Sequence, residues 1–191
     1  MNVEVREATP ADALAIRDVH LASIEGLGSS AYGAEQVAAW AHDRDPEEYP
    51  IDAEDTYFIV AERETIVGFG WLAFESGAHL VSEVDAEVVA VYVHPAVARQ
   101  GVGSALLAEL EAAARERDVE TLGLWASLPA LCFYLSHGYE RVAEHTHEFA
   151  PGTKGRVVEM KAGLRWRPSM RALLDWYQTT RTKWDSRTSN K

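Results

Sequence analysis

One stretch of this chain carries most of its structural information: Val91-Tyr92-Val93-His94-Pro95-Ala96-Val97-Ala98-Arg99-Gln100-Gly101-Val102-Gly103-Ser104-Ala105-Leu106-Leu107. The apolar run that leads into Val93 predicts a strand covered on both faces. Pro95 ends that strand. Gly101 and Gly103 predict a tight turn with close backbone approach. The apolar spacing that follows predicts a helix from there to about Arg117.

The glycines of this stretch stand where the predicted helix begins. The first turn of a helix has unpaired N–H groups and the positive end of the helix dipole, which together suit a phosphate group. A Gly-x-Gly pair is also compatible with an ordinary helix start. The choice between these interpretations depends on the surrounding sequence.

The run from Val91 to Leu107 resembles the acyl-CoA-binding motif of the GNAT superfamily of N-acetyltransferases. The family's loop pattern is Gln/Arg-x-x-Gly-x-Gly/Ala, and here it is Ala98-Arg99-Gln100-Gly101-Val102-Gly103, with Ala98 in place of Gln or Arg. The resemblance implies that the chain binds acetyl-CoA, with backbone amides, and with them Arg99, holding the pyrophosphate. The implied cofactor-binding residues are Val91, Tyr92, Val93, Arg99, Gln100, Gly101, Val102, Gly103 and Ser104.

A second motif lies about thirty residues later. Ser127 to Tyr139 resembles the family pattern Asn-x-x-Ala-x-x-Phe-Tyr-x-x-x-Gly-Phe/Tyr, with Ser127 at the Asn position. A Tyr-x-x-Glu-Gln-x-x-x-Trp run from Tyr32 to Trp40 resembles the family's cover over the acceptor site. The resemblance spans about residues 3–161. It implies an α/β fold with a mixed central sheet splayed between strands four and five and helices on both faces.

The periodicity of the chain predicts a consistent order of elements. We expect strands at about 3–6, 56–62, 65–74, 82–93, 121–125, 139–148 and 155–161. We expect helices at about 9–24, 34–41, 102–117 and 129–138. These elements form one acetyltransferase domain, 1–161, followed by a basic extension, 162–191. Met170, Leu173, Leu174 and Tyr177 predict an amphipathic helix in the extension, which would dock on the body or on a second copy of the chain.

Composition limits the partners. The 191 residues carry a formal net charge of −12. Residues 1–160 hold 10 Lys and Arg against 28 Asp and Glu, whereas residues 161–191 hold 8 against 2. Such a body repels nucleic acid and anionic membranes and favours cationic substrates. Its acidity and few lysines also suit a high-salt cytoplasm, the alternative being an ordinary acidic protein.

The sequence offers no strong signal for export or for a metal. The N-terminus lacks a signal-peptide pattern and no apolar run reaches the ~20 residues of a membrane span, so we expect a cytoplasmic protein. Cys132 is the single cysteine, and its place in the predicted helix favours a core position over a nucleophile. His145 and His147 could share a metal, but no carboxylate or cysteine spacing supports a site.

Two residues are the catalytic candidates. Glu87 occupies the position at which the family's histone-acetyltransferase branch keeps its glutamate base, in a similar Ala-Glu-apolar-apolar context; Glu83 and Asp85 are its competitors. Tyr134 matches the family tyrosine that faces the CoA sulfur and would protonate the departing thiolate. The alternative for Glu87 is an exposed strand-end acid, and for Tyr134 a buried core aromatic.

The sequence therefore predicts an acetyl-CoA-dependent N-acetyltransferase. Without an activated cysteine, direct attack by a primary amine in a ternary complex fits better than a covalent route. The acceptor, a small molecule or a peptide amine, cannot be read from the chain. Two rivals stay open: a non-catalytic acyl-CoA-binding or regulatory module of the same fold, and an interaction subunit that works through the basic tail.

Overall fold

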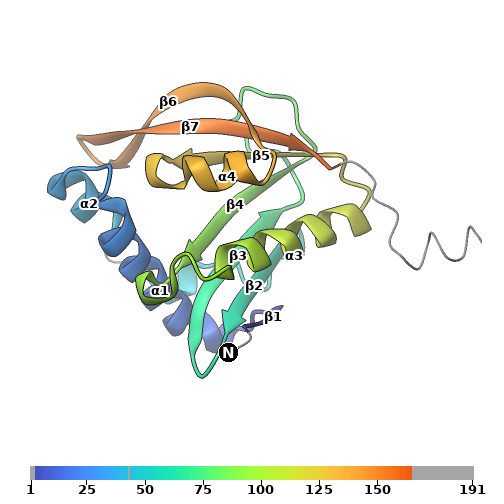
Figure 1. Cartoon of the computed structure of the whole chain (residues 1–191), viewed down its shortest axis with the longest axis horizontal. Coiled ribbons are helices and arrows are strands. Elements are labelled where there is room, and N and C mark those ends of the chain that lie inside the picture. Colours follow the sequence, from blue (N-terminus) through green and yellow to red (C-terminus); the bar gives the residue numbers. More distant parts are fainter. Residues whose placement is uncertain (1–2, 43, 165–191) are drawn as a thin grey trace, which may run out of the picture.

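The computed structural model describes residues 3–42 and 44–164 and contains one seven-stranded sheet (Figure 1). Its strand order is β1-β2-β3-β4-β5-β7-β6. The strands are β1 Glu4–Glu7, β2 Thr56–Glu62, β3 Ile66–Ala73, β4 Ala86–Val93, β5 Thr121–Ser127, β6 Glu140–Ala150 and β7 Thr153–Gly163. Neighbouring strands pair antiparallel except β4 and β5, which are parallel. The predicted mixed sheet is thereby confirmed.

Strands β4 and β5 pair only at their beginnings. The paired residues are Ala86 with Leu122 and Glu87 with Gly123. One oxygen of Asp85 fastens this end, because it accepts hydrogen bonds from the amides of Glu120 (3.1 Å) and Thr121 (2.8 Å). Beyond Glu87 the strands separate, as expected from the resemblance, and the sheet opens between its two halves.

A β-bulge lies in β4 just before the opening. Trp71 of β3 pairs with Ala90, but the next residue, Leu72, pairs with Val88, so Val89 is the extra residue. Because side chains alternate along a strand, one extra residue reverses the alternation. Glu87 consequently faces the same side of the sheet as Ala90 and Tyr92, although simple alternation from the sequence would place it on the other side.

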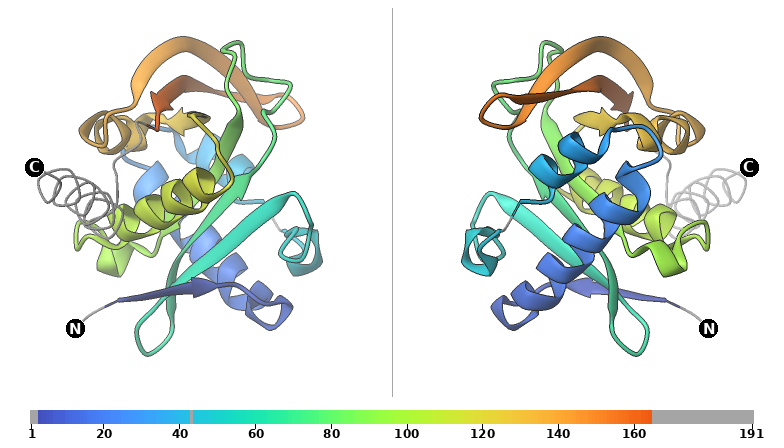
Figure 2. Two further views of the ribbon diagram at one scale, coloured as in Figure 1. Left: turned by 90° about the vertical axis from the view of Figure 1, so that its right-hand side faces the viewer. Right: turned by 90° about the vertical axis from the view of Figure 1, so that its left-hand side faces the viewer.

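Helices cover both faces of the sheet, as expected (Figure 2). On one face lie α1 (Ala13–Ser23), which continues into a π-helical turn at Ile24–Gly28, and α2 (Ala34–Trp40). On the other face lie α3 (Val102–Glu116) and α4 (Leu131–Ser136). Short 3₁₀ turns occur at Pro10–Asp12, Pro46–Glu48, Pro95–Val97 and Leu128–Ala130.

The two faces have different cores. Under α3 the core is mainly aliphatic, with Leu106, Leu107 and Leu110 completely buried. Under α1 the core is smaller and largely aromatic: Phe69 stacks on both Phe58 and Tyr92, with ring centroids 5.7 and 5.2 Å apart. The sheet separates the two cores, so each face has its own chemistry.

Several details differ from the sequence-based expectations. Strand β4 begins at Ala86 and not at Ser82, because residues before it form a loop held by Glu159, described below. Strands β6 and β7 are longer than expected and meet directly at the turn around Gly152. Cys132 is exposed, so its expected core position is wrong.

The predicted helix of the basic extension lies outside the described residues, which end at Leu164. Within the described ranges, no helix is long and apolar enough to cross a membrane.

Candidate active site

The glycine-containing loop takes the conformation that its residues predict. Gly101 has φ +85° and is the N-cap of α3, and Arg99 is also left-handed, with φ +65°. The first intrahelical bond is from the amide of Ala105 to the carbonyl of Gly101 (3.0 Å). The amides of the three preceding residues therefore have no helical acceptor and can donate to an anion.

The side chains of this loop are mostly occupied by protein contacts. The hydroxyl of Ser104 is 3.0 Å from Nε2 of His137 at the end of α4. Gln100 accepts from Arg63 (3.0 Å) and donates to the carbonyl of Ala96 (3.2 Å). Backbone amides and the exposed Arg99 are thus the groups left for a pyrophosphate.

The two glycines have different roles. A Cβ at Gly101 would meet nothing within 4 Å, so this position needs glycine for its backbone angle. A Cβ at Gly103 would lie 3.3 Å from the Phe133 ring and 3.6 Å from Val93. Gly103 therefore allows α3 to approach α4 closely at the end of β4.

Backbone groups of β4 point into the opening between β4 and β5. The amide of His94 donates to the carbonyl of Val67 on β3 (2.8 Å). Because amides in an antiparallel pair alternate in direction, those of Val91 and Val93 point away from β3, toward the opening. The amide of Tyr92 points toward β3, and its side chain lines the pocket described next.

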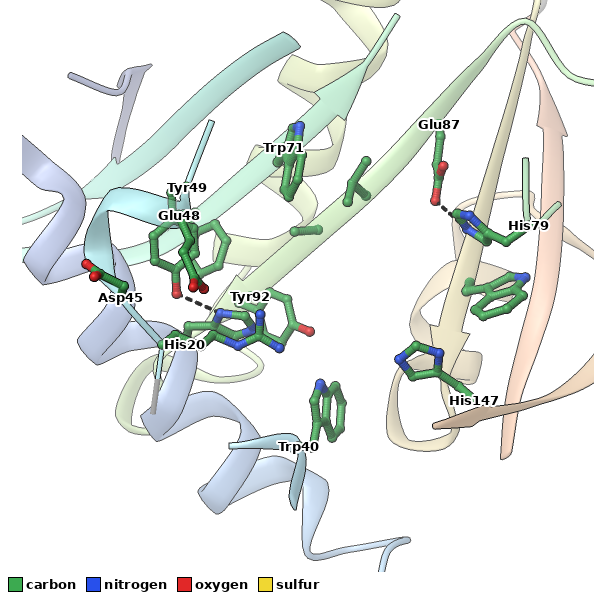
Figure 3. A pocket seen from close by; sticks show the side chains of 15 residues that line it. His20, Trp40, Asp45, Glu48, Tyr49, Trp71, His79, Glu87, Tyr92 and His147 are labelled. Atoms are coloured by element: carbon green, nitrogen blue, oxygen red, sulfur yellow. Dashed lines mark hydrogen bonds and ion pairs between the residues drawn. The ribbon is translucent and has the colours of Figure 1, made fainter. Parts of the chain in front are cut away.

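A pocket of about 310 Å³ lies on the α1 and α2 side of the opening (Figure 3). Aromatic rings, histidines and charged groups line it. The lining residues are His20, Trp40, Arg44, Asp45, Glu48, Tyr49, Phe69, Trp71, His79, Glu87, Val89, Ala90, Tyr92, Trp125 and His147. The run that ends at Trp40 thus contributes to this cavity, and His147 belongs to the pocket as well.

Glu87 is buried at one side of this pocket, with 6% of its surface exposed. One carboxylate oxygen lies 3.0 Å from Nε2 of His79. Burial raises the pKa of Glu87, and the neighbouring imidazole of His79 opposes that rise. Glu87 is therefore not an exposed strand-end acid. Its competitors differ from it: Asp85 is taken up by the β5 amides, and Glu83 is exposed.

Tyr134 lies on the opposite face of the sheet, in the core under α3 and α4. Its ring packs edge-on against Phe133 (5.0 Å) and Tyr139 (5.5 Å between centroids). Burial, and then the nearby Tyr92, raises the pKa of Tyr134, so its hydroxyl keeps its proton at neutral pH. The structure does not bring Tyr134 and Glu87 together in one pocket; they flank β4 from opposite faces.

Four pocket residues carry a buried polar atom without a hydrogen-bond partner among the residues described: His20 Nε2, Arg44 Nε, Trp71 Nε1 and Trp125 Nε1. Such atoms are normally satisfied, because an unpaired buried polar group is destabilising. Their concentration here is consistent with a polar ligand completing the pocket. Between residues 3 and 42 and from 44 to 164, no group of three or more His, Cys, Asp or Glu could hold a metal ion.

Sequence reasoning missed the loop that covers Glu87. His79 stands in a segment without a recognisable motif, and its only signal is the break at Gly77-Ala78. Glu159, in the last strand, anchors that loop, and no local pattern marks it. The contact between Ser82 and Glu159 joins segments far apart in the chain, and the His79–Glu87 pair depends on the loop that this distant contact holds.

Comparison with known proteins agrees with this geometry. Residues 54–141 match a family model described as an acetyltransferase (GNAT) domain. That segment runs from β2 to the beginning of β6 and includes Glu87, the glycine loop and Tyr134. None of the curated protein sequences matches the chain significantly.

Solved structures with the same architecture cover most of the chain. A GCN5-related N-acetyltransferase from Rhodopseudomonas palustris has 25% identity and a TM-score of 0.73, over 85% of this chain and 96% of that one. The PaiA N-acetyltransferase from Thermoplasma acidophilum, in complex with coenzyme A, has 19% identity and a TM-score of 0.63, over 85% and 99%. YncA from Salmonella typhimurium, with its cofactor acetyl-CoA, has 21% identity and a TM-score of 0.62, over 88% and 98%. The chain has the GNAT fold, and its residues 54–141 match the GNAT acetyltransferase domain.

Proposed function

We propose that the protein transfers the acetyl group of acetyl-CoA to a small primary amine by direct attack. One observation carries this proposal: the opening in the sheet has unpaired α3 amides at one face and an acidic, aromatic pocket at the other. The two reactants can therefore approach the same gap from opposite faces. The acyltransferase domain and the coenzyme-bound relatives support the same assignment.

The chain's own groups can perform each step. Bound acetyl-CoA supplies an activated acetyl group as a thioester. The first-turn amides of α3 and the guanidinium of Arg99 hold the pyrophosphate. The amides of Val91 and Val93 point into the opening and stabilise negative charge on the acetyl oxygen. Glu87 draws a proton from the substrate ammonium, directly or through a neighbour, and Tyr134 gives a proton to the departing thiolate.

The pocket indicates the class of amine. Its net charge is negative, because Asp45, Glu48 and Glu87 outnumber Arg44. Its walls include the rings of Trp40, Trp71, Tyr92 and Trp125, which favour flat apolar groups and attract cations by their faces. A cavity of about 310 Å³ suits a small molecule. We therefore propose an amine attached to a flat apolar group as the acceptor.

A thiol-release assay tests the function. Acetyl-CoA would be mixed with phenethylamine, tryptamine, n-butylamine, spermidine and a lysine-containing peptide, at low and high salt. We expect CoA release to be fastest with the two aromatic amines, because only they fill the pocket and reach its acidic side. Faster release with the peptide or with spermidine would overturn the acceptor class while keeping the enzyme.

Two further measurements separate the alternatives. Acetyl-CoA binding by calorimetry without release by any amine would favour the non-catalytic acyl-CoA-binding module. Mass spectrometry of the protein mixed with acetyl-CoA alone should show no acetylated protein, because exposed Cys132 lies outside the pocket. A stable acetyl-protein species that reacts with amine would contradict direct attack.

A further inference from the structure

The loop between β3 and β4 folds over Glu87. Gly77 lies so near that a Cβ added there would collide with one carboxylate oxygen and with the His79 ring. The other oxygen pairs with His79 Nε2 at 3.0 Å. The Glu87 side chain is 7% exposed, whereas that of His79 is 42% exposed. Both side chains line the pocket, and the imidazole is the more accessible of the two.

The position of His79 is fixed by two neighbours. The Trp125 ring packs edge-on against it, with centroids 4.5 Å apart. Three residues after His79, Ser82 donates to the completely buried carboxylate of Glu159 from its amide (2.8 Å) and from its hydroxyl (2.6 Å). Val81 donates to the same carboxylate through its amide (3.0 Å). The loop is thus fastened to β7, and the imidazole stays beside Glu87.

The geometry points to His79 as the residue that takes the proton from the substrate amine, with Glu87 behind it as a positioning residue. This inference rests on the proposed function. Nε2 donates its hydrogen to the Glu87 carboxylate, so Nδ1, on the ring edge beside Gly77, is left as the acceptor atom and is reached through one water. The ammonium loses one proton, the imidazole becomes cationic beside the carboxylate, and the proton later leaves to solvent from this partly exposed ring.

The surroundings favour this division of roles. The charged and titratable groups that face His79 are Glu87 from β4, His147 from β6 and, beyond Trp125, His145 and Glu159 from β6 and β7. Burial lowers the pKa of His147, and the nearby His79 lowers it further, so His147 stays neutral and does not repel a cationic His79. Hydrogen bonds from Ser82 and Val81 hold Glu159 in its charged form. The Glu87 carboxylate, in direct contact with Nε2, is thus the group that a proton taken up by His79 would meet.

The test compares three variants in the full-length protein, with the best amine of the panel. We expect His79→Ala to lower kcat/KM by about 10²–10⁴ at neutral pH, the usual contribution of a positioned proton acceptor. The loss should shrink at alkaline pH, where the amine is already neutral, and added imidazole should restore part of the activity. Glu87→Gln should lower kcat/KM less and shift the acid limb of the pH profile, because His79 is then present but poorly oriented.

His42→Gln is the matched control, since His42 is exposed and does not line the pocket. It should leave the acid limb in place. If His79→Ala keeps the wild-type profile while Glu87→Gln loses activity, the carboxylate itself is the base and the inference is overturned. Absence of amine-dependent release in the wild type would instead reject the proposed function, and with it the role of His79.

Discussion

The two faces of the sheet differ in the residues that cover them and in how completely their buried polar atoms are paired. Under α3, Leu106, Leu107 and Leu110 are completely buried in a core that is mainly aliphatic. On the α1 side, aromatic rings, acids and histidines surround a cavity. The described part of the chain has six buried side-chain polar atoms without a partner, and four of them belong to residues that line this cavity.

This difference suggests that the α3-side core mainly stabilises the fold, whereas the pocket on the α1 side mainly binds a ligand. Each unpaired buried polar group destabilises a fold by about 1–3 kcal/mol. A protein retains such groups where a ligand satisfies them, and the aliphatic core on the other face offsets their effect. We therefore expect substitutions under α3 to change the free energy of unfolding, and substitutions in the pocket to change kinetics with little effect on stability.

Tyr134 is the one member of the α3-side core to which we assign chemistry, so it is the strongest test of this division. Tyr134→Phe removes a hydroxyl to which no described residue hydrogen-bonds, and the ring packing stays. We expect kcat to fall by about 10²–10⁴ while acetyl-CoA affinity and melting temperature change little. Steady-state kinetics, calorimetry and thermal denaturation would measure the three quantities. A fully active variant would mean that the thiolate leaves without help.

A pair of large-to-small substitutions compares the two faces directly. Leu110→Ala opens a cavity in the aliphatic core and should lower the free energy of unfolding by about 2–5 kcal/mol, with the KM for the amine unchanged. Trp71→Phe removes an unpaired indole N–H from the pocket, and this gain offsets the packing lost with the smaller ring, so stability should change little while that KM rises. Denaturant unfolding and initial rates measure both. Equal destabilisation by the two variants would remove the distinction between the faces.

Acid should act first on the pocket side. Burial, and then Arg44, lowers the pKa of His20 from 6.5 to about 3. Below pH 6.5 the unfolded chain therefore binds a proton at His20 that the folded chain does not bind, and the free energy of unfolding falls. Burial alone would raise the pKa of Glu159, but hydrogen bonds from Ser82 and Val81 lower it from 4.5 to about 2. Its contribution, on the order of 3 kcal/mol, is present above pH 4.5 and lost toward pH 2.

Urea unfolding between pH 7 and pH 3 separates these two contributions. Glu159→Gln should flatten the part of the decline below pH 4.5. His20→Gln should flatten the part that begins at pH 6.5. A wild-type stability that stays constant from pH 7 to pH 3 would show that neither group is held in its folded-state protonation as the hydrogen bonds and burial require.

The strand and the glycine loop before α3 could be predicted from the sequence because they form one continuous segment. Strand, turn and helix follow each other from Val91 to Leu107, and each has a local cause: apolar residues, Pro95, and a glycine at a left-handed position. The motif around Tyr134 is continuous in the same way. Local rules determine such segments, so periodicity and turn residues were sufficient to place them.

The pocket on the α1 side could be predicted only in part. Trp40, Glu87 and Trp125 come from different elements, and the loop with His79 is held by Glu159 from nearly eighty residues away. The bulge at Val89 also hinders prediction. Simple alternation along β4 would place Glu87 on the face opposite Tyr92, and the bulge reverses that alternation. Nothing in Ala86-Glu87-Val88-Val89 marks a bulge, which arises from pairing with β3 and not from local preference.

The smallest effect, and the cleanest comparison within the chain, involves two glycines. Gly101 and Gly138 have φ +85° and +88°, and a Cβ would meet nothing within 4 Å at either position. Alanine should therefore cost about 1–2 kcal/mol of stability at both, from backbone strain alone. Only Gly101 precedes the unpaired amides of α3. Gly101→Ala should thus weaken acetyl-CoA binding several-fold in calorimetry, because strain relief tilts those amides, whereas Gly138→Ala should leave affinity unchanged. Equal affinities in the two variants would mean that the α3 amides do not hold the cofactor and that its pyrophosphate depends on Arg99.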